Sequence, residues 1–332
     1  MGSDLCAAEG PMGEVPQVFV IAGEPSADKH GAMLGEALSR AANVRLAGVG
    51  QTRMRDAGFD LIFDSSGWSG IGVVESLKRV PLLFVRMQML TRHLTDTPPD
   101  LLVLIDFGAF NVRLARSIRD QVDCPVLYYF PPRSWSREAD YTGLAGLVDR
   151  VATPFPWSER RLHEADIDAA WVGHPVIDRI DPPSTEERRS LRAKLRVASD
   201  NPVVGLLPGS RRTEIRCNGP EMLGAAEMIA REIPDAAFLL SRAPGVSKDR
   251  LELLVARLGL TERTVLVEGL TEIVQASDFV IAASGTATLE TAAAGCPMVI
   301  VYRGTWLMGL EKRLRHFALP FVGLPNIIAG EE

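Results

Sequence analysis

The stretch Val-Val-Gly-Leu-Leu-Pro-Gly-Ser-Arg-Arg-Thr-Glu-Ile-Arg spans residues 203–216 and shows the pattern that recurs along the chain. A short apolar run breaks at Pro208-Gly209, and Ser210-Arg211-Arg212 then lead into a helix start. This order predicts a strand, a tight turn and a helix N-terminus. Free N–H groups, the helix dipole and two guanidiniums suit a phosphate or diphosphate. The alternative is an ordinary strand-to-helix turn whose arginines are solvated.

Composition limits the class of protein. The 332 residues are 46% hydrophobic, which suits two globular domains, and the net charge of −6 argues against a general nucleic-acid binder. Cys6, Cys124, Cys217 and Cys296 are scattered without metal-ligand or disulfide spacing, which indicates a reducing compartment, and we expect the cytoplasm. Residues 1–16 lack the features of a signal peptide and are expected to be a flexible lead-in. We find no apolar run long enough to cross a membrane.

Apolar strand-like runs alternate with helical patterns along the whole chain. This alternation predicts an α/β fold with two Rossmann-like, doubly wound parallel-sheet domains that face each other across a cleft. A charged, proline-bounded segment places the boundary near residue 180. We therefore expect a first domain at 17–180, a linker and first helix at 181–202, and a second domain at 203–332.

Polar residues follow two strand-like runs of the first half, 18–22 and 101–105. Asp106 comes directly after the apolar run 101–105, where a carboxylate could act as a general base or could simply cap the next helix. After the run 18–22, the loop holds four candidate substrate contacts, and the alternative for its Ser26 or Asp28 is again a helix cap. These four are Glu24, Ser26, Asp28 and His30.

The segment 283–290 also follows a strand-like run and opens a helix. Ser284, Gly285 and Thr286 supply a second set of N–H and hydroxyl donors for phosphates. Glu290 could accept the hydroxyls of a ribose or could simply complement the helix dipole.

The segment 70–95 is apolar, carries basic residues and is interrupted by Pro81. One interpretation is two core helices. The other is a patch that touches lipid with its apolar residues and anionic head groups with its basic ones. The residues of this membrane patch would be Ile71, Val74, Leu77, Lys78, Arg79 and Leu82.

Seven motifs in this order resemble those of the lipid-A-disaccharide synthase family, from about residue 17 to 330. They are Ala22-Gly23-Glu24-Pro25-Ser26-Ala27-Asp28, Ile105-Asp106 with Phe110-Asn111, Gly173-His174-Pro175, Leu207-Pro208-Gly209-Ser210-Arg211, Ser284-Gly285-Thr286-Ala287-Thr288-Leu289-Glu290, Tyr302-Arg303 and Leu324-Pro325-Asn326.

The resemblance implies an inverting glycosyltransferase of the GT-B type. Such an enzyme joins UDP-2,3-diacylglucosamine to 2,3-diacylglucosamine 1-phosphate through a β-1,6 linkage and releases UDP. It would lie on the cytoplasmic face of the inner membrane as a peripheral protein. It would need no metal or cofactor and no nucleic acid, and a homodimer is left open.

The resemblance also assigns residues. Asp106 matches the proposed general base, and Arg211 matches the arginine expected at the donor diphosphate. The remaining donor-binding residues would be Gly209, Ser210, Ser284, Gly285, Thr286, Glu290 and Asn326. The acceptor side would comprise Glu24, Ser26, Asp28, Asn111, Trp135 and His174.

Departures from the family pattern lie on the acceptor side. Ala27 stands where the family has glycine, Lys29 where it has an apolar residue, and Ala109 where it has aspartate; the segment 131–138 also differs. The family normally continues beyond Leu324-Pro325-Asn326, so we expect a truncated second domain. Alternatives are a GT-B transferase with another acceptor, or a UDP-sugar-binding or UDP-GlcNAc 2-epimerase-like protein. A nicotinamide oxidoreductase is disfavoured because Gly48-Val49-Gly50 lacks the third glycine of the fingerprint.

Overall fold

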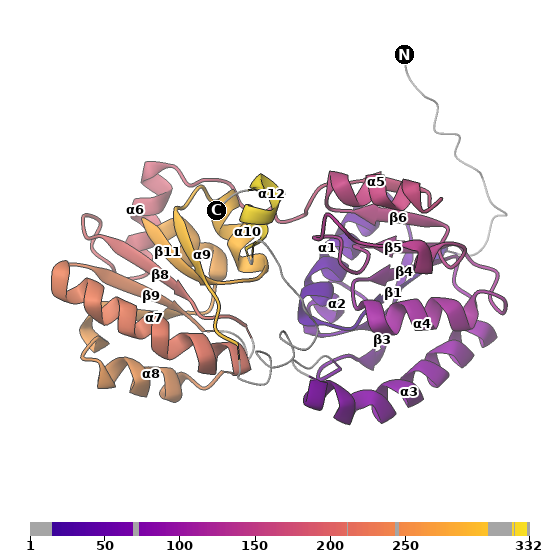
Figure 1. Cartoon of the computed structure of the whole chain (residues 1–332), viewed down its shortest axis with the longest axis horizontal. Helices are drawn as coiled ribbons and strands as arrows, with labels where there is room; N and C mark the ends of the chain where they lie inside the picture. The colour runs from indigo at the N-terminus through magenta and orange to yellow at the C-terminus, as the bar shows by residue number, and fades with distance from the viewer. Residues whose placement is uncertain are drawn as a thin grey trace, which may run out of the picture. The chain divides into compact units, whose positions relative to one another are not determined.

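The computed structural model describes residues 15–68, 73–210, 212–242, 246–304, 321 and 323–330, without the side chains of 73–79 and 212. The chain divides into two compact units, Met1–Gly173 and His174–Glu332 (Figure 1). Residues 1–14 of the expected lead-in lie outside the described part. The boundary near residue 180 and the linker at 181–202 stay predictions.

A parallel sheet forms the centre of the first unit, in the order β3-β2-β1-β4-β5-β6-β7. Both of its faces are apolar, because Val18 and Val20 pack on one face and Phe19 and Ile21 pack on the other. The strands are β1 (Gln17–Ala22), β2 (Arg45–Gly50), β3 (Asp60–Asp64), β4 (Leu101–Ile105), β5 (Val126–Tyr129), β6 (Arg150–Thr153) and β7 (Ala169–Trp171).

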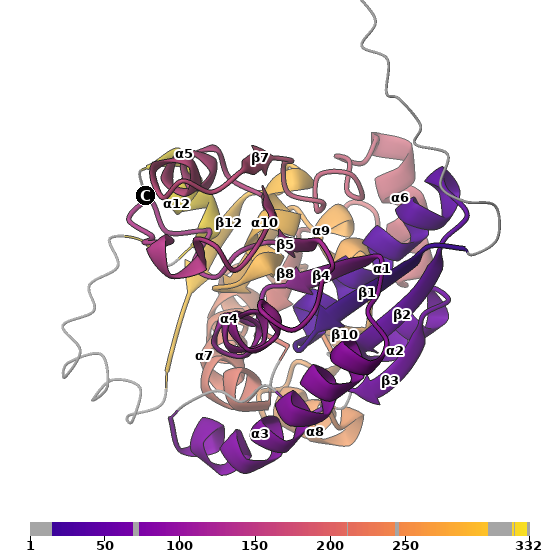
Figure 2. The same ribbon diagram turned by 90° about the vertical axis from the view of Figure 1, so that its right-hand side faces the viewer.

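Helices cover both faces of this sheet, as Figure 2 shows. α1 (Pro25–Ala41) and α2 (Thr52–Asp56) pack against the face of Val18 and Val20. The opposite face is covered by α3 (Val73–Asp96), α4 (Gly108–Ile118) and α5 (Pro156–Glu164). A short 3-10 helix lies at Thr142–Leu144.

The second unit repeats this arrangement around a parallel sheet in the order β10-β9-β8-β11-β12. Val204 and Leu206 face one core cluster, whereas Val203 and Leu207 face another. The strands are β8 (Val203–Leu207), β9 (Ala237–Ser241), β10 (Thr264–Val267), β11 (Phe279–Ala283) and β12 (Met298–Val301).

The helices of the second unit again lie on both sides. α7 (Arg212–Glu232) and α8 (Lys248–Arg257) cover the face of Val204 and Leu206. α6 (Thr185–Lys194), α9 (Leu270–Ala276) and α10 (Thr286–Ala293) cover the other. α12 (Leu324–Ala329) lies beside α10, and a 3-10 helix lies at Thr261–Arg263.

The prediction of two doubly wound parallel-sheet domains is confirmed, but the interpretation of a helix break at Pro81 is wrong. The segment 70–95 does not contain two helices broken at Pro81, because α3 runs through that proline. α7 begins at Arg212, where the stretch 203–216 predicts a helix start, and it runs through Pro220. An internal proline costs roughly 3 kcal/mol of helix stability. In α3 the burial of Leu90 and Leu94 offsets this cost.

Among the residues that the structure describes, no helix has both the length and the apolar character needed to cross a bilayer.

Candidate functional site

The first unit has a topological switch point between β1 and β4. These strands are neighbours, yet α1, which follows β1, and α4, which follows β4, cover opposite faces of the sheet. Parallel sheets bind ligands beyond the carboxyl ends of the strands at such a point, because the two diverging loops leave a crevice there. The residues to consider are therefore those that directly follow Ala22 and Ile105.

Asp106 occupies this edge in an unusual backbone conformation. Asp106 and Phe107 have φ angles of 45° and 48°, so two successive residues with side chains adopt the left-handed region. Each such residue costs about 1–2 kcal/mol. Phe107, not Asp106, is the N-cap residue of α4, and the Phe107 side chain makes no capping hydrogen bond. A helix cap therefore does not account for Asp106.

Two buried side chains bind the backbone carbonyl of Asp106. The hydroxyl of Tyr128 donates to this oxygen at 2.7 Å, and the amide nitrogen of Asn111 donates to it at 2.9 Å. The Asn111 amide also donates to the carbonyl of Ile105 at 3.2 Å. Asn111 was predicted on the acceptor side, whereas Tyr128 was missed, because an apolar strand gives no sign of where its hydroxyl will lie.

The loops after β1, β4 and β5 lie in direct contact. A β-carbon on residue 23 would come within 2.2 Å of the Phe107 ring, and one on residue 108 would come within 2.4 Å of Pro132. Glycine is therefore required at both positions, because the neighbouring loop fills the space of a side chain. The loops that carry Glu24, Asp106 and Pro132 consequently form one packed edge.

The predicted acceptor-side residues differ in their surroundings. Glu24 and Ser26 are half-buried, and Glu24 is the N-cap residue of α1 without a side-chain cap bond. His30 is buried and meets the Phe130 ring edge-on at 4.8 Å. Trp135 is half-buried. All four stay predicted ligands.

Asp28 and His174 have defined local partners. The buried carboxylate of Asp28 accepts backbone N–H bonds from Gln51, Arg53 and Met54 at the start of α2. These bonds give Asp28 a structural role that joins α1 to α2, which its sequence position did not suggest. His174, the first residue of the second unit, accepts the amide of Val176 through Nδ1 at 3.3 Å. Substrate contact by either residue stays a prediction.

The second unit has its own switch point, between β8 and β11. α7 follows β8 on one face of the sheet, and α10 follows β11 on the other. The two predicted phosphate loops, at 208–212 and 283–290, are the loops that diverge here. Their placement at this edge follows from the sheet order and agrees with the rule for ligand crevices.

A carboxylate of the chain itself lies over the first phosphate loop. Gly209 has a φ of 116°, and a β-carbon there would come within 2.5 Å of the Glu214 carboxylate. The same carboxylate accepts the backbone N–H of Ser210 at 3.0 Å. The Glu214 carboxylate thus already accepts a hydrogen bond from one of the amides that are predicted to bind phosphate. Arg211 lies outside the described residues.

The second phosphate loop is more open. Gly285, with a φ of 155°, is the N-cap residue of α10, and a β-carbon there would meet no atom within 4 Å. Thr286 is exposed and Ser284 is half-buried. Glu290 is only 5% exposed, so its predicted contact with a ribose would need an opening at this point. These assignments stay predictions.

A buried asparagine joins two segments near the first loop. Asn218 in α7 donates to the carbonyl of Pro208 at 3.3 Å and accepts the backbone N–H of Arg303 at 2.8 Å. Arg303 also pairs with Glu221. The sequence analysis missed Asn218, because nothing in a helical segment indicates a bond across 85 residues. Asn326, half-buried in α12, stays a predicted donor ligand.

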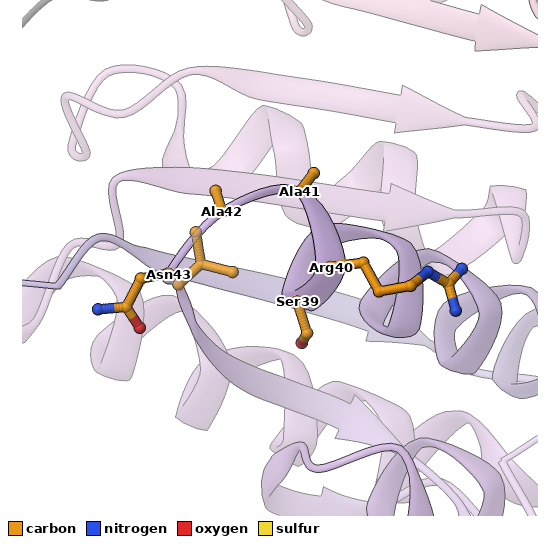
Figure 3. A pocket seen from close by; sticks show the side chains of 6 residues that line it. Ser39, Arg40, Ala41, Ala42 and Asn43 are labelled. Atoms are coloured by element: carbon orange, nitrogen blue, oxygen red, sulfur yellow. The ribbon is translucent and has the colours of Figure 1, made fainter.

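The described residues contain no group of three His, Cys, Asp or Glu side chains arranged to hold a metal ion. A surface hollow is lined by residues 39–44, where α1 ends and β2 is about to begin (Figure 3). It lies at the amino edge of the sheet, away from the carboxyl ends of β1 and β4, and it takes no part in the site.

Comparison with known proteins agrees with this arrangement. Residues 18–332 match the family model described as lipid-A-disaccharide synthetase. The chain is 37% identical over 318 residues to a lipid-A-disaccharide synthase of Geobacter sulfurreducens, which covers 95% of this chain and 81% of the relative. It is also 37% identical over 326 residues to one of Syntrophotalea carbinolica, covering 96% and 82%.

A solved structure supports the fold. The UDP-GlcNAc 2-epimerase of Neisseria meningitidis bound to UDP-GlcNAc matches with a TM-score of 0.59 over 95% of this chain and 90% of that one. Its sequence identity is 14%, so the likeness concerns the fold alone. The family match and the identities of 37% decide between the alternatives. This chain belongs to the lipid-A-disaccharide synthetase family.

Proposed function

We propose that this glycosyltransferase of lipid A biosynthesis transfers 2,3-diacylglucosamine from its UDP derivative to 2,3-diacylglucosamine 1-phosphate, with Asp106 as the general base. The observation that carries the proposal is the position of Asp106. Asp106 directly follows β4 at the switch point of the first sheet. The chain that carries it belongs to the lipid-A-disaccharide synthetase family. The backbone of Asp106 adopts the left-handed region, a strained conformation that recurs at functional sites.

On the acceptor side, the reaction needs a group that removes a proton from a hydroxyl. In the proposed step the Asp106 carboxylate takes the proton of the acceptor hydroxyl while its oxygen attacks the anomeric carbon of the donor sugar. The bond from that carbon to the UDP oxygen breaks, and its electron pair leaves with UDP. Attack from the face opposite UDP inverts the anomeric centre, as expected of this family.

On the donor side, charge develops on the departing diphosphate. The amides and hydroxyls at the start of α10, together with Arg211, are proposed to stabilise that charge. The open space at Gly285 and the exposure of Thr286 support this role, because a diphosphate must approach the backbone closely. In this proposal the charge on the diphosphate is stabilised by amides, hydroxyls and the Arg211 guanidinium of the chain itself.

The membrane part of the proposal rests on α3. Leu82, Val85 and Met89 recur at spacings of three and four residues, and they are 46%, 50% and 46% exposed. Leu90 and Leu94 of the same helix are fully buried, so α3 carries apolar side chains toward both the core and solvent. We call Leu82, Val85 and Met89 the α3 stripe and propose that it contacts the bilayer that holds both acylated substrates.

Two basic residues flank the α3 stripe in the described part of the helix. Arg86 lies over the Phe63 ring at 4.6 Å, and Arg92 pairs with Asp96. Val80 and Phe84 are also exposed, which the sequence analysis did not predict. Of the predicted patch, Leu82 is exposed and Ile71 lies outside the described residues. The side chains of Val74, Leu77, Lys78 and Arg79 are not described either.

The transfer reaction is tested by mass spectrometry of products. The purified protein is incubated with both proposed substrates, beside Asp106→Asn and the matched control Asp100→Asn. Asp100 precedes β4 at the opposite edge of the sheet and accepts the amide of Gln17, a bond that asparagine can also accept. We expect disaccharide and UDP from the parent and the control, and a loss of about a hundredfold or more in Asp106→Asn.

Two results would contradict the proposal in different ways. If Asp106→Asn makes disaccharide at the parent rate, the assignment of the base is wrong although the reaction stands. If the parent binds UDP but makes no disaccharide, the acceptor is a different molecule.

A further inference from the structure

The carbonyl of Asp106 accepts two hydrogen bonds from side chains. It accepts the hydroxyl of Tyr128 and the amide of Asn111, and both of these side chains are fully buried. The amide of Asp106 continues the sheet by donating to the carbonyl of Tyr129 at 3.2 Å. Both peptide groups of Asp106 are therefore fixed, one by the neighbouring strand and the other by two side chains.

We propose that Tyr128 and Asn111 are positioning residues, which hold the left-handed turn at Asp106 and thereby set the place of its carboxylate. The inference rests on the proposed role of Asp106 as the base. It adds Tyr128 to the site, and it gives the buried Asn111, which was predicted to contact the acceptor, a role that acts through Asp106 instead.

The backbone explains why such bonds are needed. Left-handed conformations are unfavourable for residues with a β-carbon, and here Asp106 and Phe107 adopt them in succession. Without a restraint the turn would relax toward an ordinary strand end, and the carboxylate would move with it. Asn111 bridges the carbonyls of Ile105 and Asp106, so it fixes the orientation of two successive peptide planes.

Asn111 also carries a cost that a purely structural residue would avoid. Within the described residues, its Oδ1 atom is buried without a hydrogen-bond partner. A buried polar atom of this kind lowers stability, and native proteins keep few of them. An apolar residue of similar size would remove the unpaired oxygen but would lose both donated bonds. The retention of asparagine fits a role in placing the turn.

The chemistry of Tyr128 suits a permanent donor. Burial raises the pKa of its hydroxyl well above the usual value, and the negative charge of Asp106 adds to this effect. The phenol therefore keeps its proton at any pH at which the enzyme is assayed.

Two substitutions test the proposal. Tyr128→Phe removes only the hydroxyl, and Asn111→Leu removes the donor together with the unpaired oxygen. Tyr141→Phe is the matched control, because Tyr141 is a buried tyrosine whose hydroxyl shares a hydrogen bond with Ser158 at 2.8 Å. The measurements are kcat, KM for the UDP-sugar donor, thermal unfolding and the dependence of kcat on pH.

We expect kcat to fall about tenfold or more in Tyr128→Phe and Asn111→Leu, with the donor KM unchanged within about twofold. Asn111→Leu should lose stability, because the carbonyls of Ile105 and Asp106 each lose a donor, so its kcat is measured well below its unfolding temperature. The loss of kcat should shrink as pH rises from about 7 to 9, because hydroxide replaces a misplaced base. The control should keep the parent kcat.

Three results would overturn the inference: kcat within about twofold of the parent in both variants, a loss that is the same at every pH, or an equal loss in Tyr141→Phe. Asp106→Asn separates this inference from the function on which it rests. If that variant is inactive while Tyr128→Phe and Asn111→Leu keep full activity, only the positioning role fails. If Asp106→Asn is fully active, the assignment of the base fails first.

Discussion

The ring of Phe107 lies against the backbone of Gly23 so closely that a β-carbon on residue 23 would come within 2.2 Å of it. The contact joins the loops after β1 and β4, the two strands that flank the switch point. Because Phe107 is one of the two left-handed residues, any pressure on its ring acts on the turn that carries Asp106.

Gly23→Ala should therefore reduce activity beyond its effect on stability. The added methyl group forces the Phe107 ring to move, and we expect kcat to fall about tenfold or more. Gly143→Ala is the matched control, because a β-carbon there would meet no atom within 4 Å. Steady-state kinetics and thermal unfolding of both variants check this. Equal kinetics in the two variants would show that the contact does not influence the site.

Glu214→Gln should have opposite effects on the stability of the protein and on its binding of UDP. The carboxylate accepts the Ser210 amide near the start of α7, so its loss should lower the free energy of unfolding by about 0.5–1 kcal/mol. The same change removes a negative charge from a loop proposed to bind diphosphate, so UDP should bind more tightly. Urea unfolding and calorimetric titration with UDP measure the two effects. Weaker UDP binding in Glu214→Gln would mean that Glu214 supports the site instead of competing with the nucleotide.

Charged substitutions in the α3 stripe should weaken membrane binding. Each buried apolar side chain contributes about 1.5–3 kcal/mol, so Leu82→Glu with Val85→Glu should reduce binding to anionic vesicles by at least about tenfold. Co-sedimentation with phosphatidylglycerol vesicles measures this. Met228→Glu with Leu253→Glu is the control, because these side chains are 66% and 54% exposed on the second unit. If both pairs bind alike, α3 is not the contact surface.

Cys296 should make stability fall at alkaline pH. Burial raises the pKa of its thiol from 9.0 to about 11, so the folded state holds the proton more tightly than the unfolded state does. No stability is lost below pH 9, whereas between about pH 9 and 11 unfolding releases the proton. The advantage of the parent over Cys296→Ala should shrink by about 2 kcal/mol across this window. Urea unfolding at several pH values checks this, and a constant difference would contradict it.

The sequence predicted the fold because the alternation of apolar runs and helices repeats along both halves. It also placed Asp106, Ser210 and Ser284 after strands, and the sheet order then brought each to a switch point. These predictions depend only on the succession of apolar and polar residues within short segments, and a single sequence shows that succession.

The sequence could not predict contacts between residues that lie far apart along the chain. Asn218 looks like any polar residue of a helix, yet it reaches Pro208 and Arg303. Asp28 resembles a cap of its own helix but binds the start of α2. Pro81 resembles a helix break, but the packing of α3 on the core outweighs its cost. In each case the partner is fixed by the tertiary structure.

The pairing of β1 with β4 also bears on how the protein is made. Gln17 and Asp100, which meet at the start of this pair, are 83 residues apart in the chain. During synthesis β2 is available to β1 early, whereas β4 emerges from the ribosome only after α3 has been translated. Contacts of such long range form slowly, because a large loop must close first. We therefore expect β1 to pair with β2 before it pairs with β4, so that the crevice forms only after a loop of 83 residues has closed.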